Sequence, residues 1–334
     1  MSATIKLEKK HFPVLLKELV SIISPLYGGT FLDCTFGQGG YSKKILEKEN
    51  NKVIAIDRDK EVYPYVNKLK KKHNKRFNFQ NIKFSEINKV KINSKDIKGI
   101  IFDLGYSTNQ IKDLSRGLSF KSTGKLNMKM GLNDFSSHEV ISKMSEKNLY
   151  KIFKFYGDEK HSRKIARKIV EIRKTKVLNT QDLTKIVDSV KRFKNYKINN
   201  STKIFQALRI FVNKEISELI NGLINAFNLI PVGGVIAVVT FHSIEDKIVK
   251  FFLKNYSENT KVSRYLPLKD EKKSLFKLIN KKPILPSKKE LKLNPASRSA
   301  KLRYGIKINH NYDFSEFINK FNYLLETESL YKKI

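Results

Sequence analysis

Short apolar runs alternate with helix-forming stretches over the first hundred residues of the chain. Four runs have the composition of strands, at residues 30–34, 53–57, 82–84 and 100–104. Residues 41–49 and 60–72 predict helices between them, the second with Val62, Val66 and Leu69 at helical spacing. Strands that alternate with helices in this way predict a parallel α/β sheet.

The strand pattern is missing from residues 111–211, where helical patterns replace it. Helices are predicted at residues 139–155, 158–174 and 180–193. A long helix at 213–228 and a Pro-Val-Gly-Gly turn then precede the apolar run 235–241, which predicts a return to the first sheet. We therefore expect an α/β domain in two parts, 1–110 and 212–334, with an inserted helical domain at 111–211. The Lys-rich, irregular residues after 252 predict a surface loop that leads to an edge strand.

Charge and cysteine content narrow the class of protein. The 334 residues hold 67 Lys plus Arg against 32 Asp plus Glu, a formal net charge of +35 that attracts polyanions such as nucleic acid. A coding bias toward Lys is the alternative explanation of this charge. The single cysteine, Cys34, excludes an intramolecular disulfide and a cysteine zinc cluster, which predicts a reducing, cytoplasmic location. We expect neither a secreted nor a membrane protein, because the first residues lack the apolar region of a signal peptide and no apolar run approaches the roughly 20 residues of a span.

A glycine-rich turn follows the first predicted strand, in the segment LDCTFGQGGYS. Gly37, Gly39 and Gly40 permit positive φ and close approach of a ligand, and the helix that follows offers N–H groups to an anion. Asp57 ends the second strand 18 residues after Gly39, close to the spacing at which a carboxylate meets ribose hydroxyls. The alternative is that Asp57 and its two charged neighbours form a solvated cluster. The dinucleotide fingerprint and a Walker A loop are both missing, so we expect neither NAD binding nor ATP hydrolysis.

Two more strand ends carry candidate chemistry. Asp103 precedes a glycine at the sheet edge where open α/β folds bind ligands, although Asp also caps turns at such positions. His242, Ser243, Glu245 and Asp246 follow the last apolar run. We favour helix capping by Ser243 and Glu245 over a metal site or a hydrolase triad, because no third ligand position and no glycine elbow accompany them.

Ordered segments between residues 11 and 304 resemble the signatures of one family, the ribosomal RNA small subunit methyltransferase H family, also called MraW. The segments are CTFGQGGYS, AIDRD, DLGYSTNQ, RGLSF with LNMKM, YGDEKHSRKIARKIV, FQALRIFVNKE, TFHSIEDKIVK and NPASRSAKLR. The resemblance implies a class I, Rossmann-like methyltransferase fold, with a seven-stranded, mostly parallel sheet interrupted by an all-helical domain. It also implies S-adenosylmethionine-dependent methylation of the N4 amine of one cytidine in the decoding region (P site) of 16S rRNA.

The resemblance assigns roles to residues of the predicted site. The turn at Gly37 belongs to this cofactor site, in which Gly39, Gly40 and Tyr41 would hold the methionine end. Asp57 would hold the ribose, and Phe84, Asp103 and Gln110 would line the rest of the cofactor pocket. The family usually has His at position 41, Pro at 109 and Asp at 127, where this chain has Tyr41, Asn109 and Asn127. An amide cannot act as a carboxylate base, so a mechanism that needs a carboxylate at 127 is in doubt.

The N4 amine of cytosine is a weak nucleophile, so acceptors aimed at its hydrogens would favour transfer. Asp103, Asn109 and the carbonyls of residues 104–107 are the candidates, and the cytidine must be flipped out or unpaired to reach them. Arg209 and Asn213 either approach this site or brace the domain junction.

The expected partner is 16S rRNA within the small ribosomal subunit, with no membrane partner, and a homodimer stays open. Two basic sets are predicted to contact RNA phosphates, Lys160, Arg163, Lys164, Arg167 and Lys168 on one helix and Arg298, Lys301 and Arg303 near the C-terminus. The alternatives are an enzyme that acts on cytosine in DNA and a non-enzymatic ribosome-assembly factor with a decayed cofactor pocket.

Overall fold

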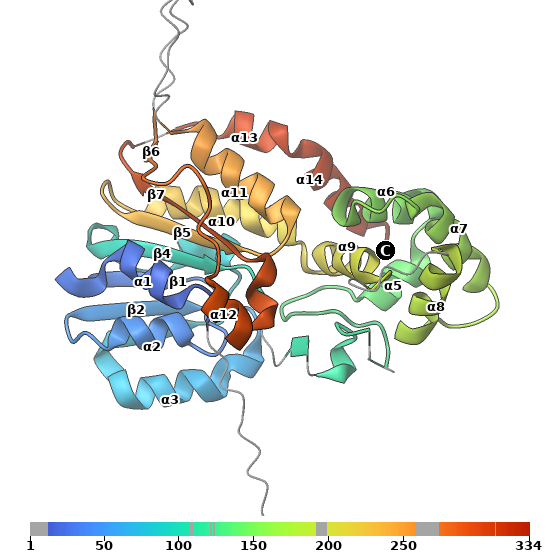
Figure 1. Cartoon of the computed structure of the whole chain (residues 1–334), viewed down its shortest axis with the longest axis horizontal. Coiled ribbons are helices and arrows are strands. Elements are labelled where there is room, and N and C mark those ends of the chain that lie inside the picture. The colour runs from blue at the N-terminus through green and yellow to red at the C-terminus, as the bar shows by residue number, and fades with distance from the viewer. Residues whose placement is uncertain are drawn as a thin grey trace, which may run out of the picture.

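A seven-stranded sheet forms the centre of one half of the molecule (Figure 1). The computed structural model describes residues 13–106, 110–111, 113–120, 122, 124–191, 199–257, 274–310 and 312–334. The strands are β1 (Gly29–Asp33), β2 (Asn51–Ile56), β3 (Phe77–Gln80), β4 (Ile97–Asp103), β5 (Val235–Thr240), β6 (Phe276–Lys277) and β7 (Lys301–Lys307). Their order is β3-β2-β1-β4-β5-β7-β6, in which β7 pairs antiparallel with β5 and β6 while the other neighbouring strands are parallel. The predicted Rossmann-like class, with a seven-stranded and mostly parallel sheet, is confirmed.

Helices cover both faces of this sheet, which explains why its central strands are almost continuously apolar. In β4, Ile100 and Phe102 belong to one buried cluster and Ile101 to the other, because successive side chains point to opposite faces. The helices α1 (Leu16–Ile23), α2 (Gly40–Leu46) and α3 (Tyr63–His73) complete the cluster of Ile101. The cluster of Phe102 is completed by α10 (Glu215–Leu229) and α11 (Ser243–Asn255).

Two strand predictions are wrong. The third strand is Phe77–Gln80 rather than 82–84, because Phe77 and Phe79 alternate with polar residues and pair with β2. Phe84 instead opens a 3-10 helix and packs its ring against Phe102 on the sheet face. The C-terminal strand β7 is not at the edge, since the two-residue β6 lies outside it.

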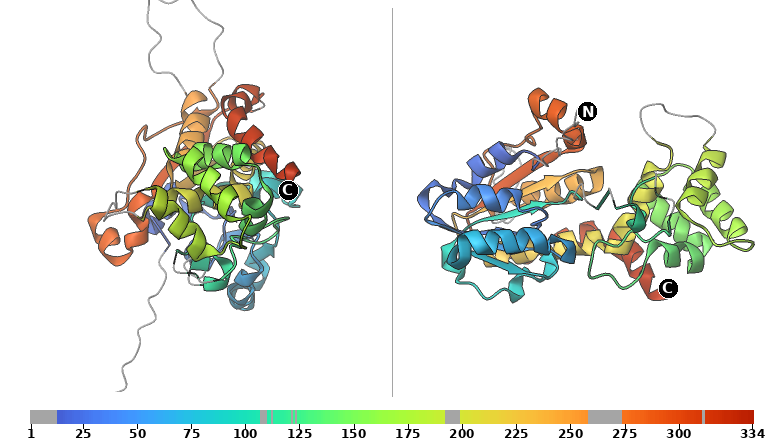
Figure 2. Two further views of the ribbon diagram at one scale, coloured as in Figure 1. Left: turned by 90° about the vertical axis from the view of Figure 1, so that its right-hand side faces the viewer. Right: turned by 90° about the horizontal axis from the view of Figure 1, so that it is seen from below.

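Between β4 and β5 the described residues form no strand: an irregular stretch leads to a series of helices from Ser137 onward. We call residues 110–213 the helical segment, and part of it stands beyond the end of the sheet (Figure 2). Its helices are α5 (Ser137–Lys143), α6 (Glu146–Gly157), α7 (Ser162–Ile172), α8 (Thr180–Val190) and α9 (Thr202–Asn213), followed by α10. The helix predicted at 139–155 is two helices, because Met144 is extended and Ser145 caps α6. The helix predicted from residue 213 begins at Glu215, after a left-handed Lys214 with φ of 50°.

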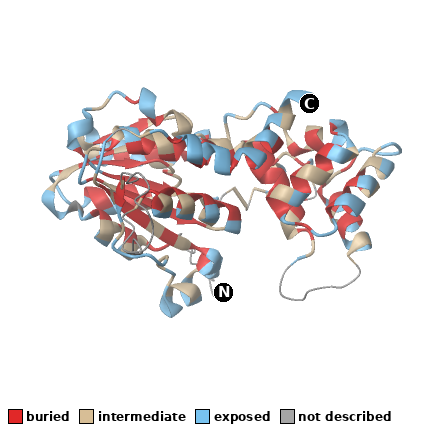
Figure 3. Cartoon of the chain, turned by 90° about the horizontal axis from the view of Figure 1, so that it is seen from above, coloured by how far each residue is buried: buried red, intermediate tan, exposed pale blue. Residues whose placement is uncertain are grey.

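One hydrophobic core connects the helical segment with the sheet. Phe102 on the sheet belongs to the same buried cluster as Leu219, Phe211, Phe153 and Ile165 of the helices. Buried residues occur both around the sheet and among the outer helices (Figure 3). After β5 the chain adds α11 and α12 (Lys288–Leu293), and it ends with α13 (Ser315–Lys320) and α14 (Asn322–Glu328). The last of these contacts α6. Within the described ranges we find no helix with the length and apolar content of a membrane span.

Candidate functional site

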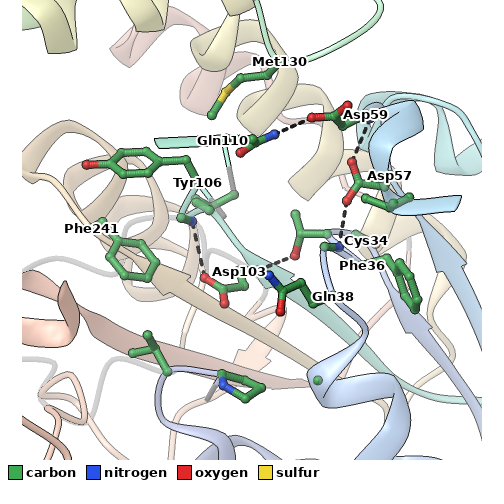
Figure 4. Close-up of a pocket in the computed structure, with 18 of the residues that line it drawn as sticks. Cys34, Phe36, Gln38, Asp57, Asp59, Asp103, Tyr106, Gln110, Met130 and Phe241 are labelled. Atoms are coloured by element: carbon green, nitrogen blue, oxygen red, sulfur yellow. Dashed lines mark hydrogen bonds between the residues drawn. The ribbon is translucent and has the colours of Figure 1, made fainter. Parts of the chain in front are cut away.

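A cavity of about 560 Å³ opens at the carboxyl ends of β1, β2 and β4 (Figure 4). Open parallel sheets bind their ligands at this edge. The volume of this cavity falls in the range of cofactor pockets. Segments far apart in sequence enclose it, from residues 13–14 at one end of the chain to 294–299 near the other.

The glycine turn forms one wall of the cavity, and its backbone explains the glycines. Gly37 and Gly39 have φ of 52° and 73°, a region that side-chain-bearing residues rarely adopt. A Cβ on Gly40 would lie 1.9 Å from Cγ of Pro13, so the two segments can meet only at glycine. Gly37 and Gly40 line the cavity, whereas Gly39 shapes the turn without lining it.

Asp57 lines the cavity beside the turn and is hydrogen-bonded directly to it. Its Oδ2 accepts a hydrogen bond from the N–H of Gly37 at 2.8 Å, and its Oδ1 accepts one from the N–H of Asp59 at 2.8 Å. Burial of the carboxylate raises the pKa of Asp57 to about 6, against the opposing effect of these two hydrogen bonds. A carboxylate has lone pairs beyond these two, so Asp57 can still accept from a ligand hydroxyl.

Asp103 lines the same cavity at the end of β4. Its N–H donates to Oγ1 of Thr35 at 2.7 Å, and its Oδ1 accepts from the N–H of Gly105 at 3.3 Å. Burial raises the pKa of Asp103 to about 7. The hydroxyl of Tyr41 lies 3.3 Å from Oδ2 of Asp103 and 2.5 Å from the carbonyl oxygen of Val14, so the Tyr41 ring fills space beside the acid. A carboxyl group with a pKa near 7 can change its protonation state at neutral pH.

The structure brings most of the predicted site residues together. Those that line the cavity are Gly37, Gly40, Tyr41, Asp57, Phe84, Asp103 and Gln110. Asn109, predicted to be an acceptor, lies outside the described residues. The amide of Gln110 donates to Oδ2 of Asp59 at 2.8 Å.

Sequence reasoning missed several residues of the lining. Tyr106 and Phe241 present aromatic rings near Asp103, and Met130 lies above Gln110 (Figure 4). Tyr106 follows Asp103 by three residues and Phe241 directly follows β5, so their strand-end positions are a signal that could have identified them. Met130 ends the LNMKM segment, but only the fold of the helical segment brings it to the cavity.

A polar cluster borders the cavity at the start of α11. His242 rather than Ser243 caps this helix, because its Nδ1 accepts from the N–H of Glu245 while Glu245 accepts from the N–H of His242. The structure also brings Glu215 here, and ligand atoms of Glu215, His242 and Glu245 lie within 4.8 Å of one another. Both carboxylate oxygens of Glu215 accept from Arg209, at 2.9 and 2.8 Å. Glu215 is the third potential metal ligand that the sequence pattern lacked, but its carboxylate is already ion-paired with Arg209.

The predicted junction residues have separate surroundings. The Arg209 guanidinium lies 5.0 Å from the ring centre of Tyr106, next to the cavity. The Asn213 amide donates to the carbonyl of Met128 at 2.9 Å and accepts from the N–H of Met130 at 2.9 Å. Arg209 therefore supports a residue of the cavity, and Asn213 braces the helical segment.

The two predicted basic surfaces differ. On α7, Arg163, Lys164 and Arg167 are exposed, as is Lys160 before it, while Lys168 is half-buried. Near the C-terminus, Lys301 and Arg303 both pair with Asp246, at 3.0 and 2.7 Å. One carboxylate therefore pairs with two of these three cations, and Arg298 is the one of the three that is exposed without such a pair in the described chain.

Comparison with known proteins places these features in a family. A family model described as the MraW methylase family matches residues 8–308. Ribosomal RNA small subunit methyltransferase H of Ehrlichia ruminantium (strain Welgevonden) is 42% identical over 305 residues, which cover 89% of this chain and 99% of the relative. The protein of that name from Rickettsia canadensis (strain McKiel) is 42% identical over 302 residues, covering 89% and 97%.

Proposed function

Because the chain belongs to the MraW methylase family, it is a methyltransferase that uses S-adenosylmethionine, and we propose that it methylates small-subunit 16S rRNA. The proposed target atom is the N4 amine of one cytidine in the decoding region. One observation carries the proposal. A single cavity is lined by a glycine turn, by a carboxylate placed to bind a ribose and by a carboxyl group with a pKa of about 7.

The residues of the cavity fit this cofactor. The carboxylate of Asp57 is a ready acceptor for the two ribose hydroxyls, and the glycine turn leaves space beside the Cα of Gly37 for the methionine end. Phe84 and Gln110 supply an apolar ring and an amide to the rest of the pocket. When bound, the cofactor supplies an electrophilic sulfonium methyl group.

The protein's own contribution is to orient the amine. Its lone pair is delocalised into the cytosine ring, and an acceptor that holds an amine hydrogen returns electron density to the nitrogen. Asp103 in its ionised form accepts that hydrogen, with Asn109 and the nearby carbonyls as further acceptors. Tyr106 and Phe241 offer rings on which the unpaired base stacks. Tyr106 is 43% exposed, so its ring can be reached by a base.

Asn127 lies outside this machinery. It lines a neighbouring depression with Arg58, Arg116 and Lys129 rather than the cofactor cavity, and its Oδ1 is buried without a partner in the described chain. The usual Asp of the family at this position would therefore not stand among the reacting groups. Its replacement by Asn therefore leaves the carboxylate of Asp103 in the cavity unaffected.

The α6–α7 surface is the proposed contact with the RNA backbone. Beside the three exposed cations of α7, exposed Lys147 and Lys154 project from α6. The guanidinium of Arg163 lies 5.2 Å from the ring centre of Tyr150 on α6, which joins the two helices. Phosphate contacts by such cations fix position without reading sequence.

Nucleoside mass spectrometry tests the proposed function. The purified protein is incubated with small ribosomal subunits that lack the modification, or with DNA, and with S-adenosylmethionine labelled in the methyl group. We expect labelled N4-methylcytidine in the 16S rRNA digest, and Asp57→Ala as the control gives none. Label in DNA alone would indicate a DNA enzyme. Donor binding without label in either polymer would indicate an assembly factor.

A further inference from the structure

Arg58, next to the ribose-binding candidate Asp57, reaches across to the helical segment. Its Nε donates to the carbonyl of Gly131 at 2.7 Å, and its Nη1 donates to the carbonyl of Asn213 at 2.9 Å. Its Nη2 lies 3.4 Å from the carbonyl oxygen of Leu132. Gly131 approaches so closely that a Cβ there would lie 2.3 Å from the backbone oxygen of Arg58. One side chain therefore fastens the end of α9 and the loop 128–133 to the end of β2.

Asp59, which follows Arg58 in the sequence, makes a second set of contacts with the helical segment. Its Oδ2 accepts from Nη1 of Arg116 at 2.7 Å and from the amide of Gln110 at 2.8 Å, and its Oδ1 accepts from Nη2 of Arg116 at 3.2 Å. The side chains of this ion pair are only 11% and 7% exposed. A buried, bidentate ion pair of this kind holds its two side chains in one geometry. Arg58 and Asp59 are therefore not a solvated charge cluster.

The same short segment also faces the cofactor cavity. The backbone N–H of Asp59 donates to Oδ1 of Asp57, so the candidate ribose acceptor is bonded directly to the backbone of the residue that forms the ion pair (Figure 4). Gln110 and Met130, which these fastenings hold in place, line the cavity themselves. The cofactor site and the attachment of the helical segment thus share three consecutive residues.

We propose that residues 57–59 couple cofactor binding to the placement of the helical segment, with Arg58 and Asp59 as positioning residues. The proposal rests on the proposed cofactor site at Asp57. A ligand on Asp57 fixes the backbone from which Arg58 and Asp59 project, and this steadies the loop 128–133. By linkage, a steadied helical segment strengthens cofactor binding to the same extent.

Hydrogen exchange with S-adenosylhomocysteine as the probe tests this coupling. The readout is the exchange of amides in loop 128–133, where Met128 donates to the carbonyl of Arg116 at 2.6 Å and Met130 to Asn213. The variants are Arg58→Lys and Arg116→Lys, each of which keeps the charge. Arg76→Lys is the matched control, because Arg76 also donates to three backbone carbonyls, at 3.3, 2.9 and 3.2 Å, all within the sheet half.

In the wild type, saturating S-adenosylhomocysteine should slow exchange in the loop. In both test variants the ligand-induced protection factor should be about tenfold lower than in the wild type, because one or two hydrogen bonds to a charged group are lost. The control should keep it. Equal protection in the test variants and the wild type overturns the coupling alone, as does an equal loss in Arg76→Lys. If the probe does not bind the wild type, the cofactor site and the coupling fall together.

Discussion

Replacing Asp103 with Asn tests whether the pKa of this buried carboxyl group lies near 7. Burial raises its pKa from 3.8 to about 7, so folding favours the protonated form. The resulting stabilisation is present at low pH and is lost as the pH rises through about 7. Between pH 5 and pH 8 the two pKa values correspond to a loss of about 3 kcal/mol from the free energy of unfolding. Asn does not titrate and removes this dependence.

Urea unfolding of both proteins at pH 5 and pH 8 measures the effect. The other acids titrate in both proteins and cancel from the difference to first order. We expect the stability of Asp103→Asn relative to the wild type to increase by about 3 kcal/mol from pH 5 to pH 8. Methyl transfer should fall on the order of 100-fold. A stability difference that stays flat with pH, or full activity in the variant, would refute the role given to Asp103.

Three further changes probe other parts of the account. Asp57→Ala should weaken S-adenosylhomocysteine binding about 10- to 100-fold in calorimetry, because the ribose loses a charged acceptor, and unchanged affinity would contradict this. Tyr41→Phe removes a hydrogen bond that lowers the pKa of Asp103, so the midpoint of the pH–rate profile should move upward by at most about one unit. A downward shift would show that Tyr41 does not act on that acid. The double change Arg163→Ala with Arg167→Ala should reduce the slope of log affinity for 16S rRNA against log salt by about 1.5, and an unchanged slope would remove α7 from the RNA contact.

The elements that sequence predicts best are those decided by local pattern. β1, β2, β4 and β5 are buried on both faces, so each is a nearly unbroken apolar run bounded by turns. The third strand was predicted at the wrong position because its sequence, FNFQ, is half polar. The more apolar residues at 82–84 instead leave the sheet and cover one of its faces. The order of β6 and β7 depends on long-range pairing that no local signal records.

The candidate site divides in the same way. Gly37, Asp57 and Asp103 are predictable because strand ends of a parallel sheet meet at one edge. The surroundings of Arg58 and Asp59 were not, since a charged pair after a strand has the same local pattern whether water or a second segment faces it. Their burial comes from residues distant in sequence: Gly131 and Asn213 accept from Arg58, and Arg116 pairs with Asp59.

A crystal structure with S-adenosylhomocysteine tests the placement of the methyl donor most directly. The account predicts the two ribose oxygens within about 3 Å of the Asp57 carboxylate and the amino-acid end beside residues 37–41. A ligand bound elsewhere on the chain, with these residues still packed against one another, would contradict it.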